Sequence, residues 1–142
     1  MRDASIEFAV PANLHAVRLL AAAFRGLMRD WKVAEERAAT LELALVEAAT
    51  NVVRHAYRDR EPNRVRVRVV REGANLFVSV IDTGNSFDPS KVPPPPIPDP
   101  DDPSTWPEGG MGLSIIRAAC HRLDYATTGD ENALTMVVHG LF

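Results

Sequence analysis

Residues 64–82 read Arg64-Val-Arg-Val-Arg-Val-Val-Arg-Glu-Gly-Ala-Asn-Leu-Phe-Val-Ser-Val-Ile-Asp82, and this segment indicates the class of fold. Arginine and valine alternate at its start, so a strand over 64–71 has one polar and one apolar face. Gly73-Ala74-Asn75 is short enough for a hairpin turn into a second strand, from Leu76 to Asp82. Such a hairpin predicts a mostly antiparallel sheet whose apolar face is covered by helices.

The flanking sequence adds helices and further strands with the expected spacing of apolar residues. Asn13 can cap the first helix, and Gly129-Asp130 makes the turn of a last hairpin. The predicted order is strand 4–10, helix 13–31, helix 34–57, strand 64–71, strand 76–82, helix 112–121, strand 123–127 and strand 133–141. The apolar stripe of the first helix is predicted at Leu14, Val17, Leu20, Phe24 and either Leu27 or Met28. This order predicts an α+β fold, a two-layer sandwich with about three helices on one face of a mixed, mostly antiparallel sheet.

Length and composition exclude several classes of protein. The 142 residues correspond to one domain, predicted over 1–142. With 16 basic and 19 acidic residues the net charge is −3, which argues against a nucleic-acid partner. No apolar run approaches the ~18 residues of a membrane span, and the N-terminus lacks the apolar core of a signal peptide. Cys120 is the single cysteine, so an internal disulfide is excluded and a cytoplasmic location is expected.

The segment 88–108 differs in composition from the rest of the chain. It holds nine of the eleven prolines, and its charges are five acids against Lys91 alone. Such a stretch cannot form a regular helix or an interior strand. Loops of this length inside a compact domain are usually functional lids or disordered segments.

A first group of polar residues lies on the second predicted helix. Glu47 and Asn51 are four residues apart and share one face, together with Thr50 and Arg54. One interpretation is the solvated stripe of an amphipathic helix. The other is a cleft wall, on which a carboxamide oxygen suits Mg²⁺ and a carboxylate can accept a proton from an attacking hydroxyl.

A second group follows the second strand of the hairpin, in Asp82-Thr-Gly84. A carboxylate at the end of a strand can accept hydrogen bonds from an exocyclic amine such as that of adenine, and a glycine allows close approach to the backbone. The alternative is an ordinary Asx turn that ends the strand.

A third group, Glu108-Gly-Gly-Met-Gly-Leu113, opens the last predicted helix. Free backbone N–H groups at a helix N-terminus, with no side chains in the way, form an anion site. The alternative is a flexible joint after the proline-rich loop.

In this order and spacing, the three groups resemble the three ATP-binding boxes of the GHKL (Bergerat-fold) ATPase superfamily. The stretch Glu47-Ala-Ala-Thr-Asn-Val-Val-Arg-His-Ala-Tyr57 is similar to the first box of the anti-sigma-factor serine kinases. Ser86-Phe87-Asp88 is also typical of those kinases. The resemblance covers nearly the whole chain.

The resemblance implies a role for each matching residue. Glu47 would be the general base, Asn51 would bind Mg²⁺ at the ATP phosphates, and Asp82 would hold the adenine amine. The other residues implied in ATP binding are Gly84, Phe87, Gly110, Gly112, Leu113 and, through water on the final strand, Thr135. Residues 88–109 would form the ATP lid.

The resemblance also implies a function in a partner-switching system. The chain would be an anti-sigma factor and an ATP-dependent protein serine/threonine kinase, usually a homodimer. It would phosphorylate an anti-sigma-factor antagonist and sequester a sigma factor, with no direct contact to nucleic acid or membrane. The alternative is a nucleotide-dependent protein-binding module without productive kinase activity. Glu47 favours the kinase, since a binding module needs no base.

Two further features leave alternatives open. The arginines of the first hairpin strand can contact an acidic partner or form the solvated face of a strand. These arginines are Arg64, Arg66, Arg68 and Arg71. Cys120 lies in an apolar helix and is expected in the core.

Overall fold

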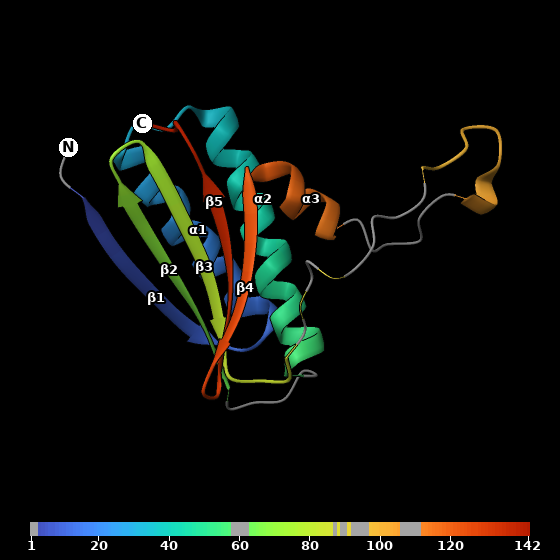
Figure 1. The fold of residues 1–142 in the computed structure, drawn as a ribbon, viewed down its shortest axis with the longest axis horizontal. Helices are drawn as coiled ribbons and strands as arrows, with labels where there is room; N and C mark the ends of the chain where they lie inside the picture. Colours follow the sequence, from blue (N-terminus) through green and yellow to red (C-terminus); the bar gives the residue numbers. More distant parts are fainter. Residues whose placement is uncertain (1–2, 58–62, 87, 89–90, 92–96, 106–111) are drawn as a thin grey trace.

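The computed structural model describes residues 3–57, 63–86, 88, 91, 97–105 and 112–142, which form a sheet with helices on one face (Figure 1). The five strands lie in the order β1-β2-β3-β5-β4, and each neighbouring pair is antiparallel. The strands are β1 (Ala4–Pro11), β2 (Arg64–Glu72), β3 (Asn75–Asp82), β4 (Arg122–Thr128) and β5 (Glu131–Val138). The predicted fold class is confirmed, with an antiparallel rather than a mixed sheet.

Three α-helices make the second layer: α1 (Leu14–Asp30), α2 (Glu35–Asn51) and α3 (Gly112–Ala119). Helices α1 and α2 lie behind the sheet in Figure 1, and α3 packs against α2. Val65, Val67 and Val69 of β2 face this layer, and pairs such as Val67–Val80 and Val69–Val78 bring buried residues of neighbouring strands together. The alternation seen in the sequence therefore sets the core face of the sheet.

The start of α1 follows the predicted capping, and its stripe needs one correction. The Asn13 side chain accepts a hydrogen bond of 2.7 Å from the backbone N–H of Ala16, which confirms the predicted cap. Met28 rather than Leu27 is fully buried. Leu14 is 43% exposed and lines a surface groove, so the predicted stripe begins in the core only at Val17.

The second helix ends earlier than predicted. Regular α-helix stops at Asn51, and a π-helical turn, η1 (Val52–Ala56), continues the chain. Apolar spacing cannot distinguish a π turn from the end of an α-helix, so the sequence predicted one helix to Tyr57. Turns of this kind are frequent at functional sites.

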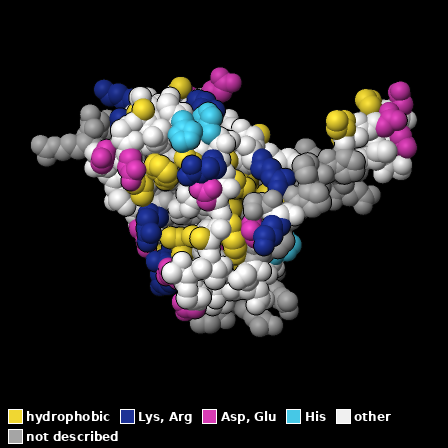
Figure 2. All heavy atoms as spheres, in the orientation of Figure 1, with side chains coloured by type: hydrophobic (Ala, Val, Ile, Leu, Met, Phe, Trp, Pro, Cys, Tyr) yellow, Lys and Arg dark blue, Asp and Glu magenta, His cyan; other side chains and the backbone are white. Residues whose placement is uncertain are grey.

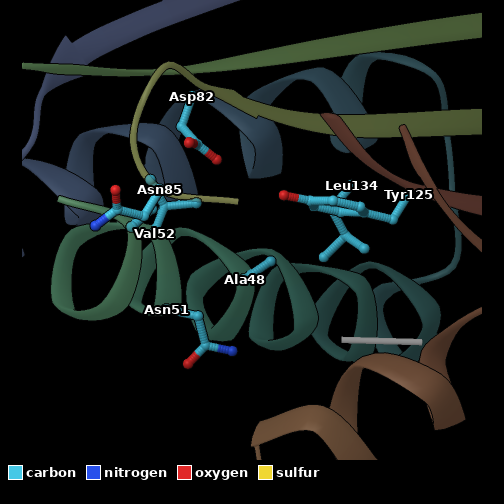
Figure 3. Close-up of a pocket in the computed structure, with 8 residues that line it drawn as sticks. Ala48, Asn51, Val52, Asp82, Asn85, Tyr125 and Leu134 are labelled. Carbon is cyan, nitrogen blue, oxygen red and sulfur yellow. The ribbon is translucent and has the colours of Figure 1, made fainter. Parts of the chain in front are cut away.

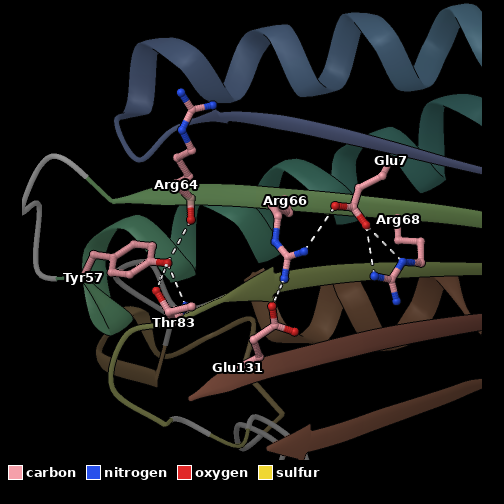
Figure 4. A network of polar contacts seen from close by, with 7 residues as sticks. All are labelled: Glu7, Tyr57, Arg64, Arg66, Arg68, Thr83 and Glu131. Carbon is pink, nitrogen blue, oxygen red and sulfur yellow. Dashed lines mark hydrogen bonds and ion pairs between the residues drawn. The ribbon is translucent and has the colours of Figure 1, made fainter. Parts of the chain in front are cut away.

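The outer face of the sheet carries charges of both signs, interleaved with apolar side chains (Figure 2). Glu7 of β1 pairs with Arg66 and Arg68, and Arg66 also pairs with Glu131 (Figure 4). Arg71 points inward instead, is only 8% exposed and lies 3.7 Å from the ring centre of Phe142. The interpretation of these arginines as the solvated face of a strand holds for Arg66 and Arg68 and is wrong for Arg71.

Part of the predicted lid lies among the described residues. A 3-10 turn, η3 (Pro103–Thr105), is held by hydrogen bonds from the backbone N–H of Ser104 to Asp102 and from the backbone N–H of Asp99 to the Thr105 hydroxyl. It lies apart from the sheet and helices in Figure 1. Short side chains that bond to nearby backbone explain how a proline-rich stretch forms one turn.

Candidate functional site

A pocket lies between the end of α2, the turn after β3 and the inner face of β4 and β5 (Figure 3). Most of its walls are apolar, and three polar side chains and one phenol reach it. The lining residues are Ala48, Asn51, Val52, Ala56, Asp82, Asn85, Tyr125 and Leu134. The structure thus brings together two predicted site residues, Asn51 and Asp82, from the first and second groups.

Asp82 is the buried acid of this pocket, with 6% of its surface exposed. Its Oδ1 accepts hydrogen bonds from the backbone N–H of Gly84 at 2.9 Å and from the Asn132 side chain at 3.0 Å. Burial raises the pKa of Asp82 above its ordinary value, and these two donors offset part of that rise. The result is a carboxylate held in one orientation at the end of β3.

Gly84 is needed by the protein's own packing. A Cβ at this position would lie 2.5 Å from the carbonyl oxygen of Ala56 and 2.9 Å from the Tyr57 ring. The close approach expected at Gly84 is therefore made by η1. The Asn85 backbone N–H also donates to the Ala56 carbonyl at 3.0 Å, so the turn after Asp82 is tied to the end of the first box.

Tyr57 adds a second tie between these segments (Figure 4). Its buried hydroxyl donates to the Arg64 carbonyl at 2.8 Å and accepts from the backbone N–H of Thr83 at 2.8 Å. One side chain thus joins the end of η1, the start of β2 and the turn that follows Asp82.

Glu47 lies one helical turn before Asn51 and meets the start of α3. A Cβ on Gly112 would stand 2.5 Å from the Glu47 carboxylate, so a glycine here lets helix and acid approach each other. The Asn51 carboxamide points away from Asp82, toward the side of α2 on which α3 lies (Figure 3). The first and third predicted groups therefore meet along α2.

Two residues expected beside Glu47 belong to another surface. Thr50 and Arg54 line a groove between α1 and α2, together with Val46 and Leu14. They lie on the α1 side of α2, whereas Asn51 lies on the pocket side. The prediction of one shared face is wrong for this pair, because successive residues of a helix turn by 100°.

Thr135 lies on the face of the sheet opposite the pocket. Its hydroxyl bonds to that of Ser79 at 2.7 Å, and its neighbour Leu134 points into the pocket. The predicted contact of Thr135 with adenine is therefore contradicted by strand alternation. Leu113 lies in the first turn of α3, next to Gly112. Phe87 and Gly110 lie outside the described residues.

A family model for the histidine kinase-like ATPase domain matches residues 10–138. The chain belongs to this family. The serine-protein kinase RsbW of Oceanobacillus iheyensis is 31% identical over 115 residues, which are 80% of this chain and 73% of that protein. The serine/threonine-protein kinase BtrW of Bordetella bronchiseptica is 29% identical over 100 residues, or 70% of this chain and 69% of that protein.

The fold of a solved structure agrees with this assignment. The crystal structure of the RsbU and RsbW domains of Rv1364c from Mycobacterium tuberculosis has a TM-score of 0.67 and 17% identity. The match covers 96% of this chain and about a third, 32%, of that one. The resemblance to the anti-sigma-factor serine kinases of the GHKL superfamily is thereby confirmed, and ATP is the nucleotide that this family implies.

Several residues of the pocket were not predicted as site residues from the sequence. Ala48 lies three residues before Asn51, and Val52 lies four residues after Ala48, so helical spacing within the first box could have found both. Tyr125, Leu134 and Asn132 come from the last hairpin, which no motif marked. Only the register of β5 on β3, which pairs Asn132 with Asp82, brings them to the site.

Two absences among the described residues bear on the kind of site. No group of three or more His, Cys, Asp or Glu side chains there could hold a metal ion by itself. A magnesium ion that is held by phosphates and one protein oxygen needs no such group. No helix of the described part is long and apolar enough to span a membrane.

Proposed function

We propose that this chain is an ATP-dependent protein serine/threonine kinase that also acts as an anti-sigma factor. The observation that carries the proposal is the order of three polar side chains, Asp82 at the end of β3 and Asn51 and Glu47 on α2. Asp82 lies at the base of an apolar pocket, Asn51 at its side, and Glu47 one turn further on, against the start of α3.

The pocket has the chemistry that an adenine ring requires. Ala48, Val52 and Leu134 supply apolar walls for the two faces of a flat ring, and Asp82 supplies an acceptor for its amino group. Because the Tyr125 hydroxyl points into the pocket (Figure 3), we expect this side chain to move aside when the base enters.

The other end of the site suits phosphates. Asn51 carries the neutral oxygen that would hold Mg²⁺, and the free N–H groups at the start of α3 would face the phosphates. Bound MgATP supplies the transferable phosphoryl group and neutralises charge between the phosphates. Glu47 would accept the proton of the attacking serine or threonine hydroxyl.

The partners follow from the family. We propose that the phosphoacceptor is an anti-sigma-factor antagonist and that a sigma factor is the protein sequestered. We also propose a homodimer, which sedimentation equilibrium of the purified chain would test. The kinase names of the two relatives support the reaction type.

Nucleotide binding tests the site first. We expect purified protein to bind MgATP with a dissociation constant in the micromolar range. In Asn51→Ala and Asp82→Asn we expect the affinity for MgATP to fall about tenfold or more, on the order expected for removal of a charge-assisted contact. Ser79→Ala is the matched control, because Ser79 lies on β3 but on the opposite face of the sheet. Absence of binding to the wild type would overturn the proposal.

The base is tested with radiolabelled ATP and an antagonist protein from the same organism. We expect Glu47→Gln to bind nucleotide as the wild type does and to lose phosphoryl transfer by about a hundredfold or more. Transfer that continues unchanged would exclude Glu47 as the base. A wild type that binds ATP but transfers nothing would indicate a nucleotide-dependent binding module.

A further inference from the structure

Asn132 is the most completely bonded polar side chain of the site, and it is only 1% exposed. Its amide nitrogen donates to Asp82 Oδ1 at 3.0 Å and to the Gly84 carbonyl at 3.0 Å. Its oxygen accepts from the hydroxyls of Thr127 at 2.8 Å and Ser86 at 3.1 Å. Two donors and two acceptor positions are the full capacity of a carboxamide.

These contacts fix which way the amide points. Turning it over would place its oxygen against two other acceptors, Asp82 Oδ1 and the Gly84 carbonyl, and each of them would lose the N–H donor that Asn132 supplies. The side chain thus joins β3, β4 and the turn 84–86 through one planar group.

The same contacts decide what Asp82 offers to a ligand. Oδ1 already accepts from Asn132 and from the Gly84 backbone, whereas no described residue donates to Oδ2. A buried carboxylate with one saturated oxygen has a single acceptor left for one N–H of an amino group. The donors also favour the ionised form, which accepts, over the protonated form, which donates.

We propose that Asn132 is a positioning residue that holds Asp82 as an ionised acceptor, with Oδ2 alone presented to the amino group of the bound base. This inference rests on the proposed nucleotide site and deepens it. Asn132 acts through Asp82 and need not touch the ligand. Asn132 can reach Asp82 because it lies near the start of β5, directly opposite Asp82 on β3.

Replacement of Asn132 by Asp tests the role with almost no change of shape. At pH 8 two carboxylates would face each other, and Asp82 would lose its side-chain donor and keep only the backbone N–H of Gly84. ADP binding should therefore weaken about tenfold or more. At lower pH the pair takes up a shared proton, and the resulting O–H replaces the lost N–H donor. The affinity of Asn132→Asp for ADP should therefore rise about threefold or more between pH 8 and pH 5.5.

The wild type and Ser79→Ala supply the comparison. Neither should gain affinity over the same interval, and the titration of the ADP phosphates is common to all three proteins. The other described titratable groups around the pair are the phenols of Tyr57 and Tyr125, and Glu131, which is paired with Arg66. A merely structural role for Asn132 would weaken binding equally at every pH, and this result would overturn the proposal.

A second measurement needs no nucleotide. The carboxyl ¹³C resonance of Asp82, followed against pH, should have its midpoint at higher pH in Asn132→Ala than in the wild type, because a donor to the ionised form is gone. An unchanged midpoint in a folded variant would overturn the positioning role. If the wild type fails to bind ADP while the midpoint moves, the proposed function fails and the link between Asn132 and Asp82 stands.

Discussion

The Glu47 carboxylate lies directly against Gly112: a Cβ on that glycine would stand 2.5 Å from Glu47 Oε2 and 3.3 Å from its Cδ. The two residues are far apart in sequence, on α2 and at the first position of α3. Their contact joins the proposed base to the glycine of the third box. Because the space is shared, a side chain at position 112 must displace the acid.

Gly112→Ala should therefore impair phosphoryl transfer more than folding. The Glu47 side chain is flexible and can give way, so we expect the free energy of unfolding to change by less than about 1 kcal/mol. We expect the rate of transfer at saturating ATP to fall about tenfold or more, since a displaced base loses its geometry. Single-turnover kinetics with labelled ATP measures this loss.

Gly26→Ala is the matched control, because nothing lies within 4 Å of a Cβ added at this helical glycine. We expect it to stabilise the protein by about 0.5–1 kcal/mol through helix propensity and to leave transfer unchanged. Equal transfer rates in Gly112→Ala and Gly26→Ala would contradict the importance of the contact.

Gly84→Ala should be far more disruptive than Gly112→Ala. The added Cβ would meet backbone, the Ala56 carbonyl oxygen at 2.5 Å and its carbon at 2.7 Å, and backbone cannot rotate away. We expect a loss of about 2 kcal/mol or more in the free energy of unfolding, by urea titration, together with weaker ADP binding. Stability within error of the wild type would show that the turn has room to relax.

Asp82→Asn should remove nucleotide binding and stabilise the fold. Asparagine can still accept the two hydrogen bonds that Asp82 Oδ1 receives, but its amide nitrogen replaces the acceptor at Oδ2. Removing a buried charge should raise the free energy of unfolding at pH 7 by about 1 kcal/mol. Urea titration and ADP titration of the same preparation check both effects.

The pH dependence of that stability has a defined sign. Because burial raises the pKa of Asp82 in the folded protein, the folded state binds this proton more tightly than the unfolded chain. The contribution of Asp82 to stability therefore falls as pH rises from the ordinary aspartate value through the raised one. Asp82→Asn should lack this component, and an identical pH profile in both proteins would contradict it.

Tyr57→Phe tests the tie between the first and second boxes. Losing the hydroxyl leaves the Thr83 N–H and the Arg64 carbonyl without this partner at a partly buried position. We expect about 1–3 kcal/mol of lost stability and a several-fold weaker affinity for ADP, because the turn that carries Asp82 is less well held. Thermal unfolding with and without ADP measures both, and unchanged affinity would limit Tyr57 to a structural role.

Cys120 should react slowly with thiol reagents. Burial raises the pKa of its thiol, and Sγ contacts the Ile116 carbonyl at 3.3 Å. We expect iodoacetamide at pH 8 to modify Cys120 at least about tenfold more slowly than it modifies glutathione. The rate of Cys120 modification should rise when urea unfolds the protein. Reaction at the rate of glutathione would show that the thiol is accessible.

The sequence alone was sufficient where local chemistry decides structure. Alternating Arg and Val over 64–71 marked the core face of β2, and the Asn13 cap followed from its short polar side chain. The three boxes likewise lie in short continuous segments, so their residue spacing was enough to single out Asn51 and Asp82, which both line the pocket. Each of these features depends on residues only a few positions apart.

Tertiary structure alone decided the features that depend on pairing between distant segments. Which face of β5 meets the pocket depends on a register in which a shift of one residue exchanges Leu134 for Thr135. The same register brings Asn132 to Asp82, and the packing of α3 on α2 brings Gly112 to Glu47. A sequence pattern gives the period of a strand or helix, whereas only the packed chain fixes its phase relative to its neighbours.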